Sequence, residues 1–305
     1  MTVVIGVDGG GTRTRAVLVD AEGRELARGE ASGAVVTTHE PEAAANAVWQ
    51  AIEAAFSAAE RSGPADVLWA GLAGAGRDDA RAAVEDALAR TRVARTIIVG
   101  TDAEAAFHDA FGDGPGVMVV AGTGSIAWAR RPDGTMVRVG GWGQDIGDEG
   151  SGLRIGVEAL RCVARAEDGR DPPTSMRDPI LEHLGLAEPI ELVTWLGGSV
   201  KGDLAALVPF VTRAADGGDV AASRVLANAV EGLVEHLTAL LDKSGPWPEP
   251  PRLALWGGLV KAGGPLRTGL AAAAADRELE LVQRELDPPL GAARLALAHG
   301  LSNRQ

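Results

Sequence analysis

The chain has 305 residues, of which 46% are hydrophobic and 23% charged, a composition typical of folded globular proteins and not of disordered ones. Its formal net charge of −13 excludes a surface that broadly attracts nucleic acid or anionic membranes, so an anionic ligand needs a local binding device. The single cysteine, Cys162, excludes an intrachain disulfide and a cysteine-ligated cluster within one chain, and the histidines form no metal-binding motif.

No apolar run reaches the length of a membrane helix, and Met1 leads straight into a predicted strand without a basic and apolar leader. We therefore predict a cytoplasmic protein that has neither a membrane nor nucleic acid among its partners.

The first part of the chain alternates short strands with helices, which indicates α/β layers. Apolar runs bounded by turn residues predict strands, and alanine-rich stretches with helical spacing predict helices. The predicted elements are strands at 3–7, 15–19 and 25–28, a helix at 41–61, a strand within 66–76, a helix at 77–90, a strand at 95–102 and a helix at 103–112.

A glycine-rich loop, VDGGGTRT, follows the first strand directly. Successive backbone N–H groups in such a loop bind phosphate, with hydroxyl groups and a guanidinium as further donors. Asp8 is placed to hold Mg²⁺ through water. The alternative is a tight hairpin with a solvated aspartate. The candidate phosphate-binding residues are Asp8, Gly9, Gly10, Gly11, Thr12, Arg13 and Thr14.

Asp102 stands at the end of the predicted strand 95–102, just before a predicted helix. One role for this residue is the N-cap of that helix. The other is a general base that accepts the proton of an attacking hydroxyl group. The two roles are compatible with each other.

After a break at 112–116 the opening pattern of strand, glycine loop, strand, turn and strand appears a second time. The spacing between Thr12 and Gly23 equals the spacing between Thr123 and Gly134. A strand follows the second loop, AGTGS, which excludes a dinucleotide fingerprint because that motif needs a helix there. The two units are predicted to close on one polyphosphate from both sides. The second loop contributes Gly122, Thr123, Gly124 and Ser125.

The glycine-dense stretch GGWGQDIGDEGSGLRIG spans residues 140–156. The flat face of Trp142 and the carboxylates of Asp145, Asp148 and Glu149 suit a polyhydroxylated ligand such as a sugar. Alternatively, Asp148 and Glu149 favour the positive end of a helix that begins near residue 151.

The remainder of the chain is mostly helical. The predicted elements are helices at 151–167, 175–184, 189–196, 203–215 and 219–243, a strand at 252–258, a helix at 265–275, a strand at 279–283 and a helix at 290–300. Gly257 and Gly258 directly follow a strand. One role for this pair is to let an adenine lie against the backbone, and the other is to form a tight turn.

Taken in this order, the motifs resemble those of the superfamily of sugar kinases, actin and heat-shock chaperones, and specifically the N-acetylglucosamine kinase and BadF/BadG/BcrA/BcrD-type ATPase family. The resemblance covers nearly the full chain. GVDGGGTRTR resembles the first phosphate motif, AGTGS the second, TDAEAA the segment with the catalytic aspartate, and WGGL the adenosine motif. GGWGQDIGDEGSG is similar to the sugar-contacting stretch of the amino-sugar kinases.

The resemblance implies an α/β fold of two ribonuclease-H-like domains of the actin-like ATPase type, at 1–113 and 114–305, with a nucleotide cleft between them. The closing helix either stays with the second domain or packs back on the first. ATP and Mg²⁺ are the implied cofactors, and Asp102 is the implied base for a sugar 6-hydroxyl. The implied sugar contacts are Thr123, Gly124, Gly141, Trp142, Asp148 and Gly152, to which the residue pattern adds Glu149; the implied adenosine contacts are Gly257, Gly258 and Leu259.

Two departures from the family pattern leave the sugar open. The loop at 30–40 has no Asn, which family members use to touch the sugar, and the loop at 71–77 lacks a Ser. The predicted function is ATP-dependent phosphorylation of N-acetylglucosamine or glucosamine. The alternatives are a hexokinase or glucokinase of broad specificity, and a sensor that binds ATP or sugar without catalysis. Many relatives form homodimers, but the sequence leaves the oligomeric state open.

Overall fold

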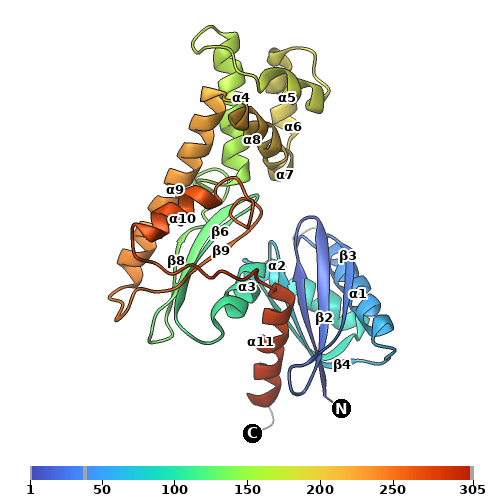
Figure 1. Ribbon diagram of the computed structural model, residues 1–305. Coiled ribbons are helices and arrows are strands. Elements are labelled where there is room, and N and C mark those ends of the chain that lie inside the picture. Colours follow the sequence, from blue (N-terminus) through green and yellow to red (C-terminus); the bar gives the residue numbers. More distant parts are fainter. Residues whose placement is uncertain (1, 37–39, 303–305) are drawn as a thin grey trace. The chain divides into compact units, whose positions relative to one another are not determined.

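The computed structural model describes residues 2–36 and 40–302, and Figure 1 shows the course of the chain. The chain divides into two compact units. Unit 1 comprises Met1–Asp113 together with Leu286–Gln305, and unit 2 comprises Gly114–Glu285. Each unit contains its own mixed sheet and its own helices, as expected for α/β layers.

The sheet of unit 1 has five strands in the order β3-β2-β1-β4-β5. The first three strands form an antiparallel meander, and β4 and β5 run parallel to β1. The carboxyl ends of β1, β4 and β5 therefore meet at one edge of the sheet. The strands are β1 (Val3–Gly9), β2 (Arg13–Asp20), β3 (Glu25–Ser32), β4 (Ala65–Leu72) and β5 (Ala94–Gly100).

Alternation along β1 directs its side chains into two cores. Val3, Ile5 and Val7 pack with α1 (Pro41–Ala58) and α2 (Asp78–Thr91) on one face. Val4 packs on the other face, where α3 (Asp102–Phe111) and α11 (Pro288–Ser302) lie. The glycine at position 6 shares that second face, because a Cβ there would collide with the backbone of α11.

The sheet of unit 2 has four strands in the order β8-β7-β6-β9, again an antiparallel meander with a parallel strand beside it. This confirms that the strand–loop–strand unit of the opening sequence is used twice. The strands are β6 (Gly116–Ala121), β7 (Ser125–Arg130), β8 (Met136–Gly140) and β9 (Leu253–Trp256).

The helices of unit 2 form one large core with its sheet. The long helix α9 packs against β7 and β8, and α4 packs against α7, α8 and α9. The helices are α4 (Gly152–Glu167), α5 (Arg177–Leu184), the 3₁₀ turn η1 (Pro189–Glu191), α6 (Leu192–Gly198), α7 (Lys201–Ala205), α8 (Val208–Asp216), α9 (Val220–Ser244) and α10 (Arg267–Ala275).

Three sequence predictions about these elements are wrong in part. Strand β5 ends at Gly100, because the Thr101 side chain already caps α3. The single helix predicted over 203–215 is two helices, α7 and α8, which end and begin around Leu207. The predicted strand 279–283 pairs with its neighbour through one isolated bridge between Leu281 and Leu253, too little for a strand.

Candidate functional site

The first glycine loop connects β1 to β2 through a tight turn, in which the Gly10 N–H donates to the Arg13 carbonyl at 3.0 Å. The Gly10 carbonyl accepts from the Ala34 N–H at 3.0 Å, and a Cβ on Gly33 would collide with the backbone of Gly11. The neighbouring segment therefore supports the loop closely. Its tip, Gly11, Thr12 and Arg13, stays exposed, as a phosphate-binding loop requires.

Thr14 differs from the rest of this loop. Its side chain is fully buried on β2, and its hydroxyl donates its one proton to the Ser32 carbonyl at 2.6 Å. A hydroxyl group has a single proton to donate, so in this arrangement Thr14 fixes β2 to β3 and does not offer a donor to a phosphate.

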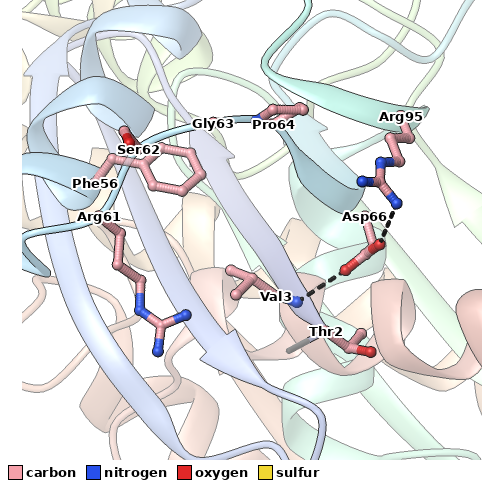
Figure 2. A pocket seen from close by; sticks show the side chains of 9 residues that line it. All are labelled: Thr2, Val3, Phe56, Arg61, Ser62, Gly63, Pro64, Asp66 and Arg95. Atoms are coloured by element: carbon pink, nitrogen blue, oxygen red, sulfur yellow. Dashed lines mark hydrogen bonds and ion pairs between the residues drawn. The ribbon is translucent and has the colours of Figure 1, made fainter.

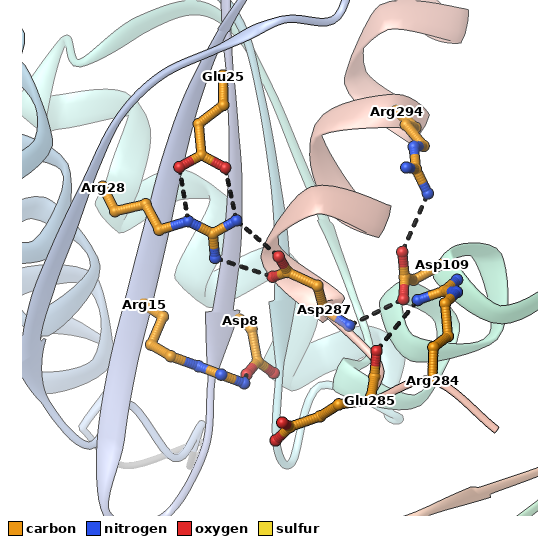
Figure 3. A network of polar contacts seen from close by, with 9 residues as sticks. All are labelled: Asp8, Arg15, Glu25, Arg28, Asp109, Arg284, Glu285, Asp287 and Arg294. Atoms are coloured by element: carbon orange, nitrogen blue, oxygen red, sulfur yellow. Dashed lines mark hydrogen bonds and ion pairs between the residues drawn. The ribbon is translucent and has the colours of Figure 1, made fainter.

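Asp8 lies near the carboxyl end of β1 and is only 7% exposed. Its Oδ2 accepts from the Arg15 guanidinium at 2.7 Å, across the directly paired position of β2 (Figure 3). Burial raises the pKa of Asp8 above its usual value, although the hydrogen bond and charge of Arg15 act in the opposite direction. Sequence analysis missed Arg15, yet the register of a hairpin predicts that the two residues pair.

Asp102 is the first residue of α3 and not its N-cap. Thr101 is the N-cap: its hydroxyl accepts from the Glu104 N–H at 3.1 Å, while the Glu104 carboxylate accepts from the Thr101 N–H at 2.6 Å. This capping box fixes the first turn of the helix without the Asp102 side chain. Asp102 Oδ1 accepts only from the adjacent Ala103 N–H at 3.0 Å among the described residues.

The environment of Asp102 suits a proton acceptor. Burial, followed by the negative charge of Asp8, raises the pKa of Asp102 to about 6. A carboxyl group with such a pKa is deprotonated at neutral pH and is a stronger base than an ordinary aspartate. The two carboxylates come together because parallel β1 and the β5–α3 connection end at the same edge of the sheet.

Asp8 and Asp102 also fit the requirements of Mg²⁺. The ion is bound by one or two carboxylates together with water and substrate phosphates, and a dication would relieve the mutual repulsion that raises the pKa of Asp102. Within residues 2–36 and 40–302, no group of three or more His, Cys, Asp or Glu side chains forms a metal cage. The donor set therefore suits an ion that arrives with its phosphate ligand.

The second glycine loop, in unit 2, joins β6 to β7 and packs on the start of α4. The Gly122 N–H donates to the Gly124 carbonyl at 2.9 Å, which closes a tight turn. The Gly122 and Thr123 carbonyls accept from the Gly152 and Leu153 N–H groups at 2.8 and 3.2 Å. The loop and the first turn of α4 are thus one structural unit.

Asp148 links this loop to the glycine-dense stretch. It is only 4% exposed and has a left-handed backbone with φ of 63°, which is uncommon for a residue other than glycine. Its Oδ1 accepts from the Ser125 N–H at 3.2 Å, and its Oδ2 pairs with Lys201 Nζ at 3.0 Å. A Cβ on Gly124 would lie 2.9 Å from Oδ1. Asp148 therefore holds the loop in place.

The side chains of Asp148 and Glu149 do not cap α4. The N-cap of α4 is Ser151, whose side chain accepts from the Arg154 N–H. The Glu149 carbonyl instead accepts from the Ser125 hydroxyl at 2.6 Å, and its carboxylate lies 3.3 Å from His236 Nε2 on α9. Nothing in the local sequence pointed to Lys201 or His236, since both contacts are made across long sequence separations.

Gly141 and Trp142 lie on the chain after β8. Gly141 has φ of 70°, and a Cβ there would lie 2.6 Å from the Ile126 side chain, so only glycine fits. Trp142 is 65% exposed, with the Arg138 guanidinium 5.5 Å from its ring centroid. An exposed indole face of this kind is available for stacking on a sugar ring.

The turn after β9 also reaches the second glycine loop. Gly257 has φ of 109°, and a Cβ there would collide with the Ala121 carbonyl. The Leu259 N–H donates to that same carbonyl at 3.2 Å. Gly258 has open space beside it. In unit 2 the structure thus brings together three of the predicted motifs: the second glycine loop, the stretch around Asp148 and the Gly257–Leu259 turn.

A sequence model of the BadF/BadG/BcrA/BcrD ATPase family matches residues 5–296. The chain belongs to this family. The resemblance of its motifs, taken in their order along the chain, is confirmed.

The relatives of this chain include sugar kinases. The chain is 29% identical over 245 residues to the N-acetylmuramic acid/N-acetylglucosamine kinase of Clostridium acetobutylicum, covering 79% of this chain and 80% of the relative. It is 30% identical over 248 residues to the glucosamine kinase GspK of Vibrio cholerae, covering 80% and 82%. The resemblance to sugar kinases that the sequence motifs predict is therefore confirmed.

A solved structure also supports the fold of this chain. The crystal structure of a putative N-acetylglucosamine kinase from Chromobacterium violaceum matches with a TM-score of 0.80 and 29% identity, over 97% of this chain and 99% of the other. This match and the two meander-plus-parallel sheets confirm the predicted α/β fold of the actin-like ATPase type. Among the described residues, no helix is both long and apolar enough to cross a membrane.

Proposed function

We propose that the chain is an ATP-dependent kinase that phosphorylates the 6-hydroxyl of an amino sugar, N-acetylglucosamine or glucosamine. The observation that carries this proposal is the pair of neighbouring carboxylates in unit 1, of which Asp102 has a pKa raised to about 6. Family membership and the sugar-kinase relatives support the same reaction.

Asp102 is proposed as the general base. Its carboxylate would accept the proton from the sugar hydroxyl as that oxygen attacks the γ-phosphorus of ATP, and ADP would leave. The attacking oxygen forms the new P–O bond while the bond to the β-phosphate bridging oxygen breaks. The capping box at Thr101 and Glu104 keeps the first turn of α3 fixed during this transfer, so the base does not need to reorganise.

Phosphate binding is proposed for the exposed tip of the first loop and for the second loop. Gly11, Thr12 and Arg13 are exposed in unit 1, where their backbone N–H groups would act as donors. In unit 2 Thr123 and Gly124 would act, because the Gly122 and Ser125 N–H groups already donate to the Gly124 carbonyl and to Asp148 Oδ1. Mg²⁺ held near Asp8 would supply charge neutralisation for the transferring phosphoryl group. Thr14 and Ser125 would contribute structure only, because their hydroxyl protons are already donated to the Ser32 and Glu149 carbonyls.

The sugar site is proposed around Trp142 and the second loop. The Asp148 and Glu149 carboxylates already contact Lys201 and His236, so each is held in one orientation for accepting sugar hydroxyl groups. Gly152 and Thr123 complete the group at the start of α4. The adenosine would lie against the Gly257–Leu259 turn. A cytoplasmic location and a homodimer stay predictions.

The decisive experiment measures ADP release from Mg-ATP with N-acetylglucosamine, glucosamine, glucose and mannose offered separately. Asp102→Asn keeps the size and the Oδ1 acceptor but removes the base, so turnover should fall by about 10² to 10⁴. Asp86→Asn is the matched control, since it makes the same change at an exposed position of α2. NMR of the product identifies the phosphorylated oxygen.

The outcomes separate the alternatives. Turnover on an amino sugar that Asp102→Asn abolishes supports the proposal. Preference for glucose would instead assign a hexokinase, which agrees with the missing Asn in the loop at 30–40. Part of that loop lies outside the described residues. ATP and sugar binding without ADP release would assign a sensor. Wild-type turnover in Asp102→Asn would remove Asp102 from the mechanism.

A further inference from the structure

A cavity of about 390 Å³ opens in unit 1 at the edge of the sheet opposite to Asp8 and Asp102. It is lined by the start of β1, the segment after α1 and the starts of β4 and β5 (Figure 2). Val3 begins β1 and Asp8 lies five residues further on, so the cavity and the proposed catalytic edge are roughly 17 Å apart at about 3.3 Å per residue. A ligand here would be separate from the proposed ATP site.

Two arginines line this cavity, and they differ in their partners. Arg95 pairs with Asp66 at 3.3 Å, and Asp66 also accepts from the Val3 N–H at 3.0 Å. The Asp66 charge is thereby compensated. The exposed Arg61 side chain makes no hydrogen bond or ion pair with any part of the chain that the structure describes. Figure 2 shows the Arg61 side chain extended beside Val3, while Arg95 turns onto Asp66.

Asp66 is the only acidic residue that lines the cavity and it pairs with Arg95, so the charge on Arg61 has no carboxylate partner within the lining. The lining thus contains one balanced ion pair and one additional positive charge, and Arg95 retains N–H donors beyond the one that contacts Asp66. A guanidinium presents a planar set of donors that matches the oxygens of phosphate and carboxylate groups.

The lining also contains an apolar wall. Phe56, from the last turn of α1, is buried and contributes to the cavity beside the polar groups. A volume of this size is in the range of small-molecule sites and exceeds what a bare anion needs. The lining also contains Gly63, which has φ of 97° and nothing within 4 Å of the position that a Cβ would take.

We propose that this cavity binds a small organic anion, a phosphate or carboxylate compound, through Arg61 and Arg95. The anionic group would accept hydrogen bonds from the two guanidinium groups, and the remainder of the ligand would pack on Phe56. The proposal does not depend on the proposed kinase activity, because none of the candidate catalytic or phosphate-loop residues lines the cavity.

The test is calorimetric titration of the full chain with inorganic phosphate and, separately, with succinate, in a buffer of low ionic strength. We expect saturable binding of one or both probes, weakened by added salt because the contact is electrostatic. Arg61→Gln should weaken binding by about tenfold or more, the loss of a charge-assisted hydrogen bond. Arg95→Gln, which also leaves Asp66 uncompensated, should weaken it further.

The matched control is Arg90→Gln, the same change at an exposed arginine of the same unit that pairs with Glu42 and does not line the cavity. A non-hydrolysable ATP analogue added at saturation should leave the binding intact. Which probe binds decides between the phosphate and carboxylate classes. Absence of saturable binding for both, equal affinities in Arg61→Gln and wild type, or binding that the analogue abolishes would overturn the proposal. A lower Tm in Arg61→Gln with unchanged affinity would mean that Arg61 only complements the end of α1.

Discussion

At the scale of single residues, the position of Asp102 creates a conflict between stability and function. The side chain is half-buried, does not cap its helix and lies near the negative charge of Asp8. A carboxylate in this environment costs folding free energy. The same environment suits the proposed role of Asp102 as general base, because a disfavoured carboxylate is a better proton acceptor.

This conflict gives a prediction in pH. Since the base must be deprotonated, kcat/KM for the sugar should rise as pH increases through about 6, the pKa of Asp102, and level off above it. The measurement is kcat/KM between pH 5 and 8 with Mg-ATP well below saturation, so that the profile reports Asp102 in the chain without the dication. A profile that stays flat across this range would contradict the assignment of Asp102 as base.

The same pKa predicts an opposite effect on stability. The folded chain holds the Asp102 proton up to about pH 6, whereas the unfolded chain releases it near the usual value of 3.8. Between these values the folded state binds more protons, so this group lowers the free energy of unfolding as pH rises. At pH 7 Asp102→Asn should therefore raise the free energy of unfolding, by on the order of 1–3 kcal/mol. Denaturant melts at pH 4 and pH 7 test this, and a gain as large at pH 4 would contradict it.

At the scale of elements, α11 is fixed to unit 1 by close backbone approach and by ion pairs. The Asp109 carboxylate of α3 accepts from the Asp287 N–H at 2.8 Å and from Arg294 at 3.0 Å, and Asp287 pairs with Arg28 of β3 (Figure 3). A Cβ on Gly291 would collide with the Ala105 carbonyl of α3. The position of α3, and with it Asp102, therefore depends on this contact.

Two glycines of α11 make a matched pair for testing that dependence. Gly291→Ala should lower the free energy of unfolding by about 1–3 kcal/mol, because the new methyl group has no room against α3. Gly300→Ala places its Cβ 3.4 Å from Val67, an ordinary contact, and should gain up to about 1 kcal/mol from helix propensity. Denaturant melts of the two variants give the comparison. Equal effects would show that α11 does not pack on α3 as described.

At the scale of the whole molecule, the chain completes its first unit with its last helix. The unit 1 core beneath α11 contains Val4, Val17, Val19 and Trp69 from the central strands. A chain ending at Glu285 would expose this apolar face, and we expect it to aggregate or to unfold in unit 1. Size-exclusion chromatography and circular dichroism check this against a control chain ending at Ser302. A monodisperse, folded product from the shorter chain would contradict the division into units.

The sequence by itself determined the α/β class, the two strand–glycine loop–strand units and the order of the motifs. These are local patterns: apolar alternation sets strands, glycine permits the loops, and the same short stretch appears twice. The pairing of Asp8 with Arg15 also follows from hairpin register, although it was missed.

Only the tertiary structure decided which distant residues meet. Lys201 pairs with Asp148, and His236 lies beside the Glu149 carboxylate. The Thr14 hydroxyl donates to the Ser32 carbonyl. Arg61 has no side-chain partner among the described residues. These contacts join residues on different elements. They therefore depend on how the helices and strands pack, and no periodic pattern in the sequence predicts them. The pKa of Asp102 has the same origin, because burial and the charge of Asp8 exist only once β1 and α3 lie side by side.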